Sequence, residues 1–190
     1  ADRLQLGLPY GQDAVIGALA EANPNLAVVF VSGNAVAMPW IDRVPAVLEA
    51  WYSGSEAGNA LADVLFGAVN PSGKLPFTFP VRLEDCSAAG EYPGEGQVVY
   101  RDGIFVGYRW IEKERIEPLF AFGHGLSYTT FDIANVRADR TSLATTGRLR
   151  VSADVTNTGG RAGAEVVQLY IGDKLSSLPR PVKELKGFEK

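Results

Sequence analysis

The sequence has 190 residues, of which 46% are hydrophobic and 21% are charged, values that are ordinary for a globular protein. Its formal net charge of −4 offers no basic surface to nucleic acid, and no apolar run approaches the roughly 20 residues of a membrane-spanning helix. Cys86 is the only cysteine, so no disulfide can form within the chain. The sequence therefore predicts no nucleic-acid partner and no membrane span.

The N-terminal part of the chain is typical of helices that alternate with buried strands. The apolar spacing of residues 12–22 predicts a helix. Its buried face is expected to consist of Val15, Ile16, Leu19 and Ala20. The apolar runs 26–31 and 46–51 are typical of parallel strands that are covered on both faces.

The turn after the first of these strands lies where ligand-binding loops of α/β sheets gather. A dinucleotide site would need the pattern G-x-G-x-x-G directly after the strand. The sequence offers only Gly33 there, followed by Asn34, so a dinucleotide cofactor is excluded. A tight turn at the end of the strand explains this segment.

Residues 51–80, WYSGSEAGNALADVLFGAVNPSGKLPFTFP, are predicted to form a polar loop, a helix, a turn and a strand. Ser55 is expected to cap the helix at its N-terminus, and Gly67 is expected to end it. The turn at 70–73 then leads to a strand at 75–79. Together with the preceding strand this makes a strand–helix–strand unit, which is the building block of parallel sheets.

The pattern changes in the second half of the chain. Residues 82–97 are rich in Gly, Pro, Ser and acidic residues and predict a long loop, whereas 98–111 favour an extended segment. Residues 118–131 are expected to be a packed connector. From there apolar and polar residues alternate, as in 149–156, which is typical of the antiparallel strands of a β-sandwich.

The predicted fold is thus α/β, with a mainly parallel sheet and flanking helices as part of an α/β sandwich, followed by an incomplete all-β sandwich of the immunoglobulin or fibronectin III type. We place the first domain at 1–124, including the connector, and the second at 125–190. About seven strands are needed for such a sandwich, and the remaining length holds three or four. The sequence is therefore expected to be an internal piece of a longer protein.

The stretch 51–80 resembles the second, α/β-sandwich domain of glycoside hydrolase family 3, the β-glucosidase and β-xylosidase family. Its loop departs from the usual family pattern once, because Ser53 stands where Pro is common. The segments ADRLQLGLP and FGHGLSYTTF are also similar to this family, and VVQLYIGDKLSSLPRPVKELKGFEK resembles its fibronectin type III-like domain. The resemblance implies a retaining, exo-acting β-glycosidase that removes a terminal β-linked sugar through a covalent glycosyl-enzyme intermediate, without a cofactor.

The same resemblance implies that both catalytic carboxylates lie outside this sequence. In the family the nucleophile is an Asp of an N-terminal (β/α)8 barrel, which is an expected partner domain. The acid/base is a Glu in a segment like E-G-x-D-R-x-x-L-x-L-P, so that Glu is expected just upstream of Ala1. Asp2 and Arg3 match this segment and are expected near the substrate. Trp51 is also expected to contact the substrate, since aromatic rings suit the apolar faces of sugars.

Structural explanations compete with each of these roles. Asp2 and Arg3 are also explained as an exposed charged pair near a chain terminus. Trp51 follows a buried strand, so packing in the core is an alternative to contact with a sugar. Glu56 is better explained as an acidic residue at a helix N-terminus. His124 is the only histidine, so no metal site is predicted, and no G-x-S-x-G pattern marks a serine hydrolase.

Two functions remain open on the sequence alone. The first is the β-glycosidase, acting on a β-linked oligosaccharide or glycoside, of which this part alone is expected to be inactive. The second is a non-catalytic module that binds carbohydrate or protein. The motifs favour the enzyme, and the resemblance implies a periplasmic or secreted location. The identity of the sugar is not predicted, because barrel loops largely set it.

Overall fold

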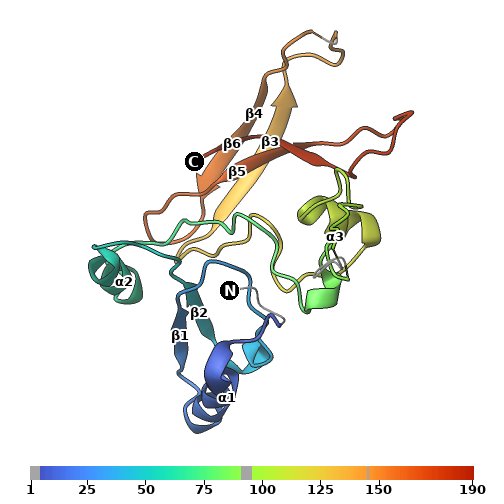
Figure 1. The fold of residues 1–190 in the computed structure, drawn as a ribbon. Coiled ribbons are helices and arrows are strands. Elements are labelled where there is room, and N and C mark those ends of the chain that lie inside the picture. The colour runs from blue at the N-terminus through green and yellow to red at the C-terminus, as the bar shows by residue number, and fades with distance from the viewer. Residues whose placement is uncertain (1–4, 91–95, 145) are drawn as a thin grey trace.

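The computed structural model describes residues 5–90, 96–144 and 146–190 (Figure 1). Its helices are α1 (Gln12–Ala22), α2 (Ala57–Leu65) and α3 (Tyr108–Glu114). Its strands are β1 (Ala27–Phe30), β2 (Ala46–Glu49), β3 (Phe131–Ala138), β4 (Val151–Asn157), β5 (Val167–Ile171) and β6 (Glu184–Glu189). None of the helices in the described ranges is long and apolar enough to cross a membrane.

Helix α1 has the predicted bounds, but its buried face was predicted only in part. Ile16 and Ala20 pack against the core, whereas Val15 and Leu19 are 58% and 49% exposed. The helix instead turns Gly17 inward, where a Cβ atom would lie 3.1 Å from the guanidinium of Arg43. Gly17 is therefore the one buried residue of α1, and the predicted apolar face is only partly covered.

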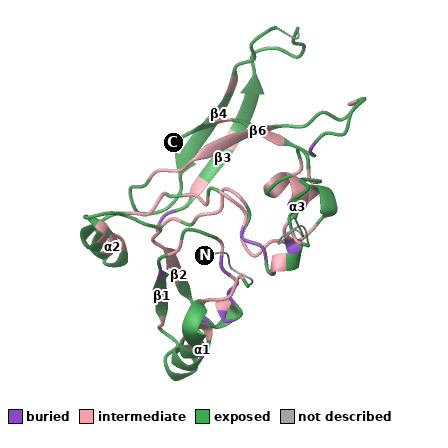
Figure 2. Cartoon of the chain, viewed as in Figure 1, coloured by how far each residue is buried: buried purple, intermediate pink, exposed green. Residues whose placement is uncertain are grey.

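Both runs predicted as parallel strands are strands, β1 and β2, and they pair parallel with each other, with Ala27 opposite Ala46 and Phe30 opposite Glu49. The expectation that both faces are covered is wrong for β1. Val28 and Phe30 are buried, while Ala27 and Val29 are exposed, so buried and exposed residues alternate along β1 (Figure 2). In the described part of the chain only one face of this pair meets the hydrophobic core.

The core lies on that face and is centred on aromatic side chains. Trp40 and Phe79 are each 1% exposed and pack with Val36 and Met38. The indole Nε1–H of Trp40 donates a hydrogen bond of 2.7 Å to Asp13 Oδ1. The buried ring thus keeps its polar atom satisfied and links the core to α1.

The N-cap of helix α2 lies one residue after the predicted cap, Ser55. Glu56, not Ser55, is the N-cap, and no side chain caps the helix; Glu56 Oε2 instead accepts a hydrogen bond from Asn59 Nδ2. The predicted end is confirmed, because Gly67 has a φ of 78° and its N–H bonds to Val64 O. No residue of α2 is buried.

Two predicted extended segments differ in the structure. Residues 75–79 form no parallel strand; they run antiparallel to 120–124, with one bridge between Phe79 and Phe120. The end of segment 98–111 enters α3, which starts after Gly107 and packs its buried Ile111 inward. Aromatic residues favoured the extended prediction, but here they occupy the faces of a short helix.

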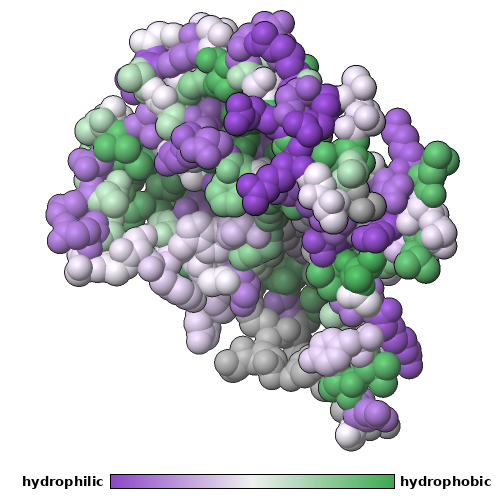
Figure 3. Space-filling model, turned by 90° about the horizontal axis from the view of Figure 1, so that it is seen from above, coloured by the Kyte–Doolittle hydropathy of each residue, from purple (hydrophilic) through white to green (hydrophobic). Residues whose placement is uncertain are grey.

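Strands β3–β4 and β5–β6 form two antiparallel pairs, as the alternation predicted. No residue described in these four strands is buried, and Figure 3 shows apolar residues interspersed with hydrophilic ones on the face seen from above. The predicted fold class is confirmed: an α/β part precedes strands of a β-sandwich. The domain boundary after residue 124 stays a prediction.

Candidate functional site

The carboxyl ends of β1 and β2 carry a group of polar and aromatic side chains. Glu49, the last residue of β2, accepts a hydrogen bond of 3.2 Å from Ser32 N–H and one of 2.8 Å from Trp51 N–H. Its other carboxylate oxygen lies 3.0 Å from Ser32 Oγ. One carboxylate therefore fixes the loops that follow both strands, at the edge where α/β proteins place ligands.

Trp51 adopts a backbone conformation that bulky residues avoid. Its φ is 50°, in the left-handed region, where a residue with a Cβ atom pays about 1–2 kcal/mol. The half-buried ring meets Phe77 and Phe79 edge-on, at centroid distances of 5.4 Å and 6.3 Å. Strain of this kind clusters at functional sites, which makes the loop at 50–56, the site loop, the candidate site.

The site loop presents a second aromatic side chain to solvent. Tyr52 is 78% exposed, and its ring lies against Gly33 so closely that a Cβ there would be 2.8 Å from Tyr52 Cε2. Ser53, which replaces the proline common in the family, donates a hydrogen bond from its hydroxyl to Ala50 O. The loop can therefore offer an exposed ring and a phenolic hydroxyl to a polyhydroxylated ligand.

The segment leading into α1 is anchored to the core next to these loops. Leu6 O accepts a hydrogen bond of 2.9 Å from Ala37 N–H, and Asp13 Oδ2 accepts one of 3.0 Å from Leu8 N–H. Asp2 and Arg3 precede this anchor and lie outside the described residues. Their predicted place near the substrate stays a prediction.

The other candidates from the sequence have structural roles in the described residues. Glu56 is exposed and bonds within α2, as the helix-terminus explanation predicts. The ring of His124 stacks on Phe120 at 4.9 Å, and burial, together with the nearby Lys74, lowers the pKa of His124. Among the described residues no group of three or more His, Cys, Asp or Glu side chains is placed to hold a metal ion.

Sequence reasoning missed Glu49 and Tyr52. Glu49 is the one charged residue in the apolar run 46–51, and a lone carboxylate at the end of a buried strand was the available signal. Tyr52 gave no such signal, because its exposure follows from the turn that Trp51 makes.

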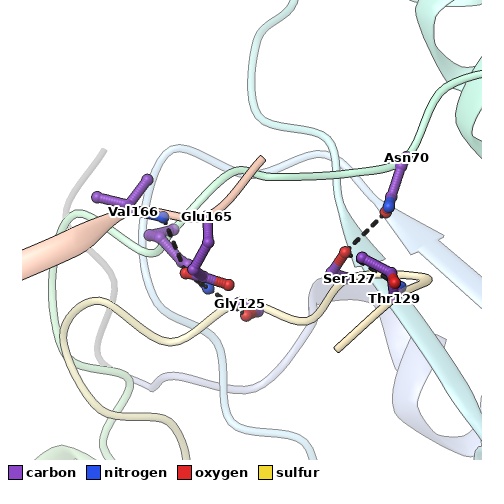
Figure 4. Close-up of polar contacts among 7 residues, drawn as sticks. Asn70, Gly125, Ser127, Thr129, Glu165 and Val166 are labelled. Atoms are coloured by element: carbon purple, nitrogen blue, oxygen red, sulfur yellow. Dashed lines mark hydrogen bonds and ion pairs between the residues drawn. The ribbon is translucent and has the colours of Figure 1, made fainter. Parts of the chain in front are cut away.

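A second polar cluster, the junction, joins residues 70–74 to 123–130 and 162–166 (Figure 4). Lys74 Nζ lies 2.6 Å from Glu165 Oε1 and donates a hydrogen bond of 2.7 Å to Gly125 O. Both charged side chains are only 16% exposed. A Cβ at Gly125 would lie 2.2 Å from Gly73 O, so the two backbones touch. The junction therefore ties the α/β part to the segment that leads into β5.

Asn70 completes the junction with three hydrogen bonds. Its Oδ1 accepts from Ser127 Oγ and Tyr128 N–H at 2.9 Å and 2.8 Å, and its Nδ2 donates to Ala162 O at 3.0 Å. The hydroxyl of Tyr128 donates to Val64 O in α2 at 2.8 Å. Helix α2 thus runs from the site loop at its start to the junction at its end.

The comparisons agree with this arrangement. Residues 1–128 match the glycosyl hydrolase family 3 C-terminal domain, and residues 165–190 match the fibronectin type III-like domain. The chain therefore belongs to glycoside hydrolase family 3.

Known proteins are similar to this chain along its whole length. It is 52% identical to beta-glucosidase BoGH3A of Bacteroides ovatus and 50% identical to thermostable beta-glucosidase B of Acetivibrio thermocellus, of which it covers 26% and 25%. It also resembles the crystal structure of DesR, a beta-glucosidase from Streptomyces venezuelae in complex with D-glucose. The TM-score is 0.92 and the identity 46%, over 100% of this chain and 24% of DesR. The chain spans about a quarter of the length of these relatives.

Proposed function

We propose that the chain is part of a retaining, exo-acting β-glycosidase of the β-glucosidase type, which hydrolyses a terminal O-glycosidic bond. The observation that carries this proposal is similarity along the entire chain to proteins named beta-glucosidases, at 50–52% identity. The candidate site agrees with it, because the site loop combines aromatic rings with hydroxyl groups, and this combination suits a sugar ring.

The proposed chemistry divides between this chain and other parts of the enzyme. Retaining glycosidases use two carboxyl groups about 5–5.5 Å apart, one as nucleophile and one as general acid/base with a raised pKa. By family resemblance, an Asp of a (β/α)8 barrel is the nucleophile. The acid/base is a Glu that precedes Asp2 and Arg3, which hold its loop in place.

Glu49 is not proposed as either catalytic carboxylate. Two backbone N–H groups, from Ser32 and Trp51, donate to one of its oxygens, and Ser32 Oγ lies beside the other. These contacts tie the carboxylate to the loops that follow β1 and β2, which is a positioning role. Its role is to hold Trp51 and Tyr52 where they contact the sugar.

Hydrolysis of aryl β-glycosides tests this proposal. The chromogenic β-D-glucoside and β-D-xyloside are assayed with the 190-residue chain alone and with a protein that also carries the barrel and the preceding Glu. We expect turnover only from the second protein. Turnover by the 190-residue chain alone would contradict the assignment of the catalytic carboxylates. No turnover of any aryl β-glycoside by the barrel-containing protein would favour the binding module instead.

A further inference from the structure

A pocket of about 610 Å³ opens between α3, the β5 strand and residues 116–122. Figure 1 shows α3 beside the β5–β6 pair, and polar contacts hold the two together. Tyr108 OH accepts a hydrogen bond of 2.9 Å from Leu185 N–H, and Arg109 lies 3.4 Å from Glu184. The pocket has a volume in the range of roughly 300–1,000 Å³ that is typical of small-molecule sites.

Aromatic rings form one side of this pocket. Tyr108 lies between Phe122 and Tyr170, at centroid distances of 5.1 Å and 5.9 Å, and all three residues line the cavity. Burial raises the pKa of Tyr170, and Tyr108 and Glu112 add to this effect, so its hydroxyl keeps its proton. That hydroxyl donates to Gln168 Oε1 at 2.5 Å.

Polar groups with incomplete hydrogen bonding lie among the residues that line the pocket. Glu112 Oε1 pairs with Lys183 Nζ at 2.8 Å. Glu112 Oε2 and Thr78 Oγ1 are buried atoms for which the described residues provide no hydrogen-bond partner. Because buried polar atoms are nearly always paired, these two sites call for donors from outside the described structure.

The charges around the pocket select the kind of ligand. Two acidic residues, Glu112 and Glu117, face two basic residues, Arg115 and Lys183, so neither an anion nor a cation is favoured. A neutral molecule with an apolar face for the rings and several hydroxyls for Glu112 and Thr78 fits best. We propose that this pocket binds a pyranose unit of a carbohydrate. The proposal concerns binding only and does not require the protein to be catalytically active.

Isoleucine side chains that line the pocket allow ligand binding to be followed directly by NMR. Ile111 and Ile116 line it, whereas Ile133 lies in β3. With isoleucine methyl groups labelled with carbon-13 in the full-length protein, methyl 1-thio-β-D-glucoside, which resists hydrolysis, is titrated and followed by NMR. We expect saturable shifts of the Ile111 and Ile116 methyl signals and no shift of Ile133. Absence of these shifts, or equal shifts with the open-chain polyol sorbitol, would overturn the proposal.

Variants separate specific binding from general effects of the sugar. Glu112→Gln replaces the carboxylate with a neutral amide, Thr78→Val removes the hydroxyl, and each is expected to weaken binding at least about fivefold. Glu114→Gln is the matched control, because Glu114 is on the same helix, pairs with Lys113 and does not line the pocket. Unchanged affinity in both pocket variants would also overturn the proposal. Since the readout is local, an enzyme without glycosidase activity still gives a decisive answer.

Discussion

The α/β part and the four strands β3–β6 are stabilised in different ways. The α/β part buries a cluster of hydrophobic residues, namely Val28, Phe30, Val36, Met38, Trp40, Val44 and Phe79. The described strands β3–β6 bury none of their residues and rely on antiparallel ladders, which are joined to the α/β part at the junction. Side-chain packing therefore dominates in the first part, and directional polar contacts connect it to the second.

This difference has a consequence for mutations. A core side chain affects stability through its volume, so truncation costs transfer energy and leaves a cavity. A junction side chain acts through pairing, so removing one partner costs more than removing both. Three predictions test this distinction.

The largest effect is expected for Trp40→Ala. The change empties a site that is 1% exposed and leaves Asp13 Oδ1 without its indole donor, so the free energy of unfolding should fall by about 3–5 kcal/mol. Urea denaturation followed by circular dichroism measures it. Phe188→Ala in β6 is the control, since this ring is 71% exposed and its loss should cost less than about 1 kcal/mol. Equal losses in the two variants would contradict the comparison.

The next effect is expected for Lys74→Met at the junction. It leaves Glu165 as an unpaired carboxylate that is only 16% exposed, and we expect a loss of about 3 kcal/mol. The double variant Lys74→Met/Glu165→Leu removes both charges and should recover most of this loss. The same urea titrations apply, and a double variant that is less stable than the single one would contradict pairing as the cause.

The smallest effect is a pH dependence from His124. Its pKa is lowered in the folded protein, first by burial and then by Lys74, so the unfolded chain takes up a proton at higher pH than the folded one. Stability should therefore fall as the pH drops through about 6.5 and level off below the folded pKa. Thermal unfolding between pH 7.5 and 5 should show a shallower slope for His124→Gln than for the wild type. Parallel slopes would exclude this histidine as the source.

Local patterns predicted a large share of the fold. The helix at 12–22 has its predicted bounds because Asn23-Pro24 stops it and its interior lacks strong helix breakers other than Gly17. The two short apolar runs predicted strands at 27–30 and 46–49 and their parallel type, whereas their pairing with each other comes from the structure. Gly67 ends α2 for the predicted reason, its left-handed backbone.

The differences arise where distant contacts override local preference. Residues 75–79 have the composition of a strand, but they pair with Phe120 and its neighbours, far along the chain. The helix α3 was predicted as extended because Tyr108, Trp110 and Ile111 favour strands; in the structure Tyr108 meets Leu185 instead. Single-sequence periodicity carries no information about such partners.

The candidate site was only partly accessible to sequence reasoning. Sequence reasoning singled out Trp51 because an aromatic ring suits the apolar face of a sugar, and its contact with the substrate stays a prediction. Its left-handed backbone gave no sequence signal, because such conformations are expected of Gly or Asn and not of a bulky aromatic residue. Glu49 stands out in the sequence as a lone carboxylate in an apolar run, but its contacts with Ser32 and Trp51 follow only from the placement of β1 beside β2.

The backbone at position 51 also matters for redesign of this protein. A procedure that improves local backbone preference would replace Trp51 with Gly or Asn, which accept a φ of 50° at little cost. The exchange would relax the loop and at the same time delete the ring that packs on Phe77. Selection for stability and selection for activity are thus expected to favour different residues at position 51. A library of variants at this position, sorted separately for stability and for activity, would show which requirement determines the residue.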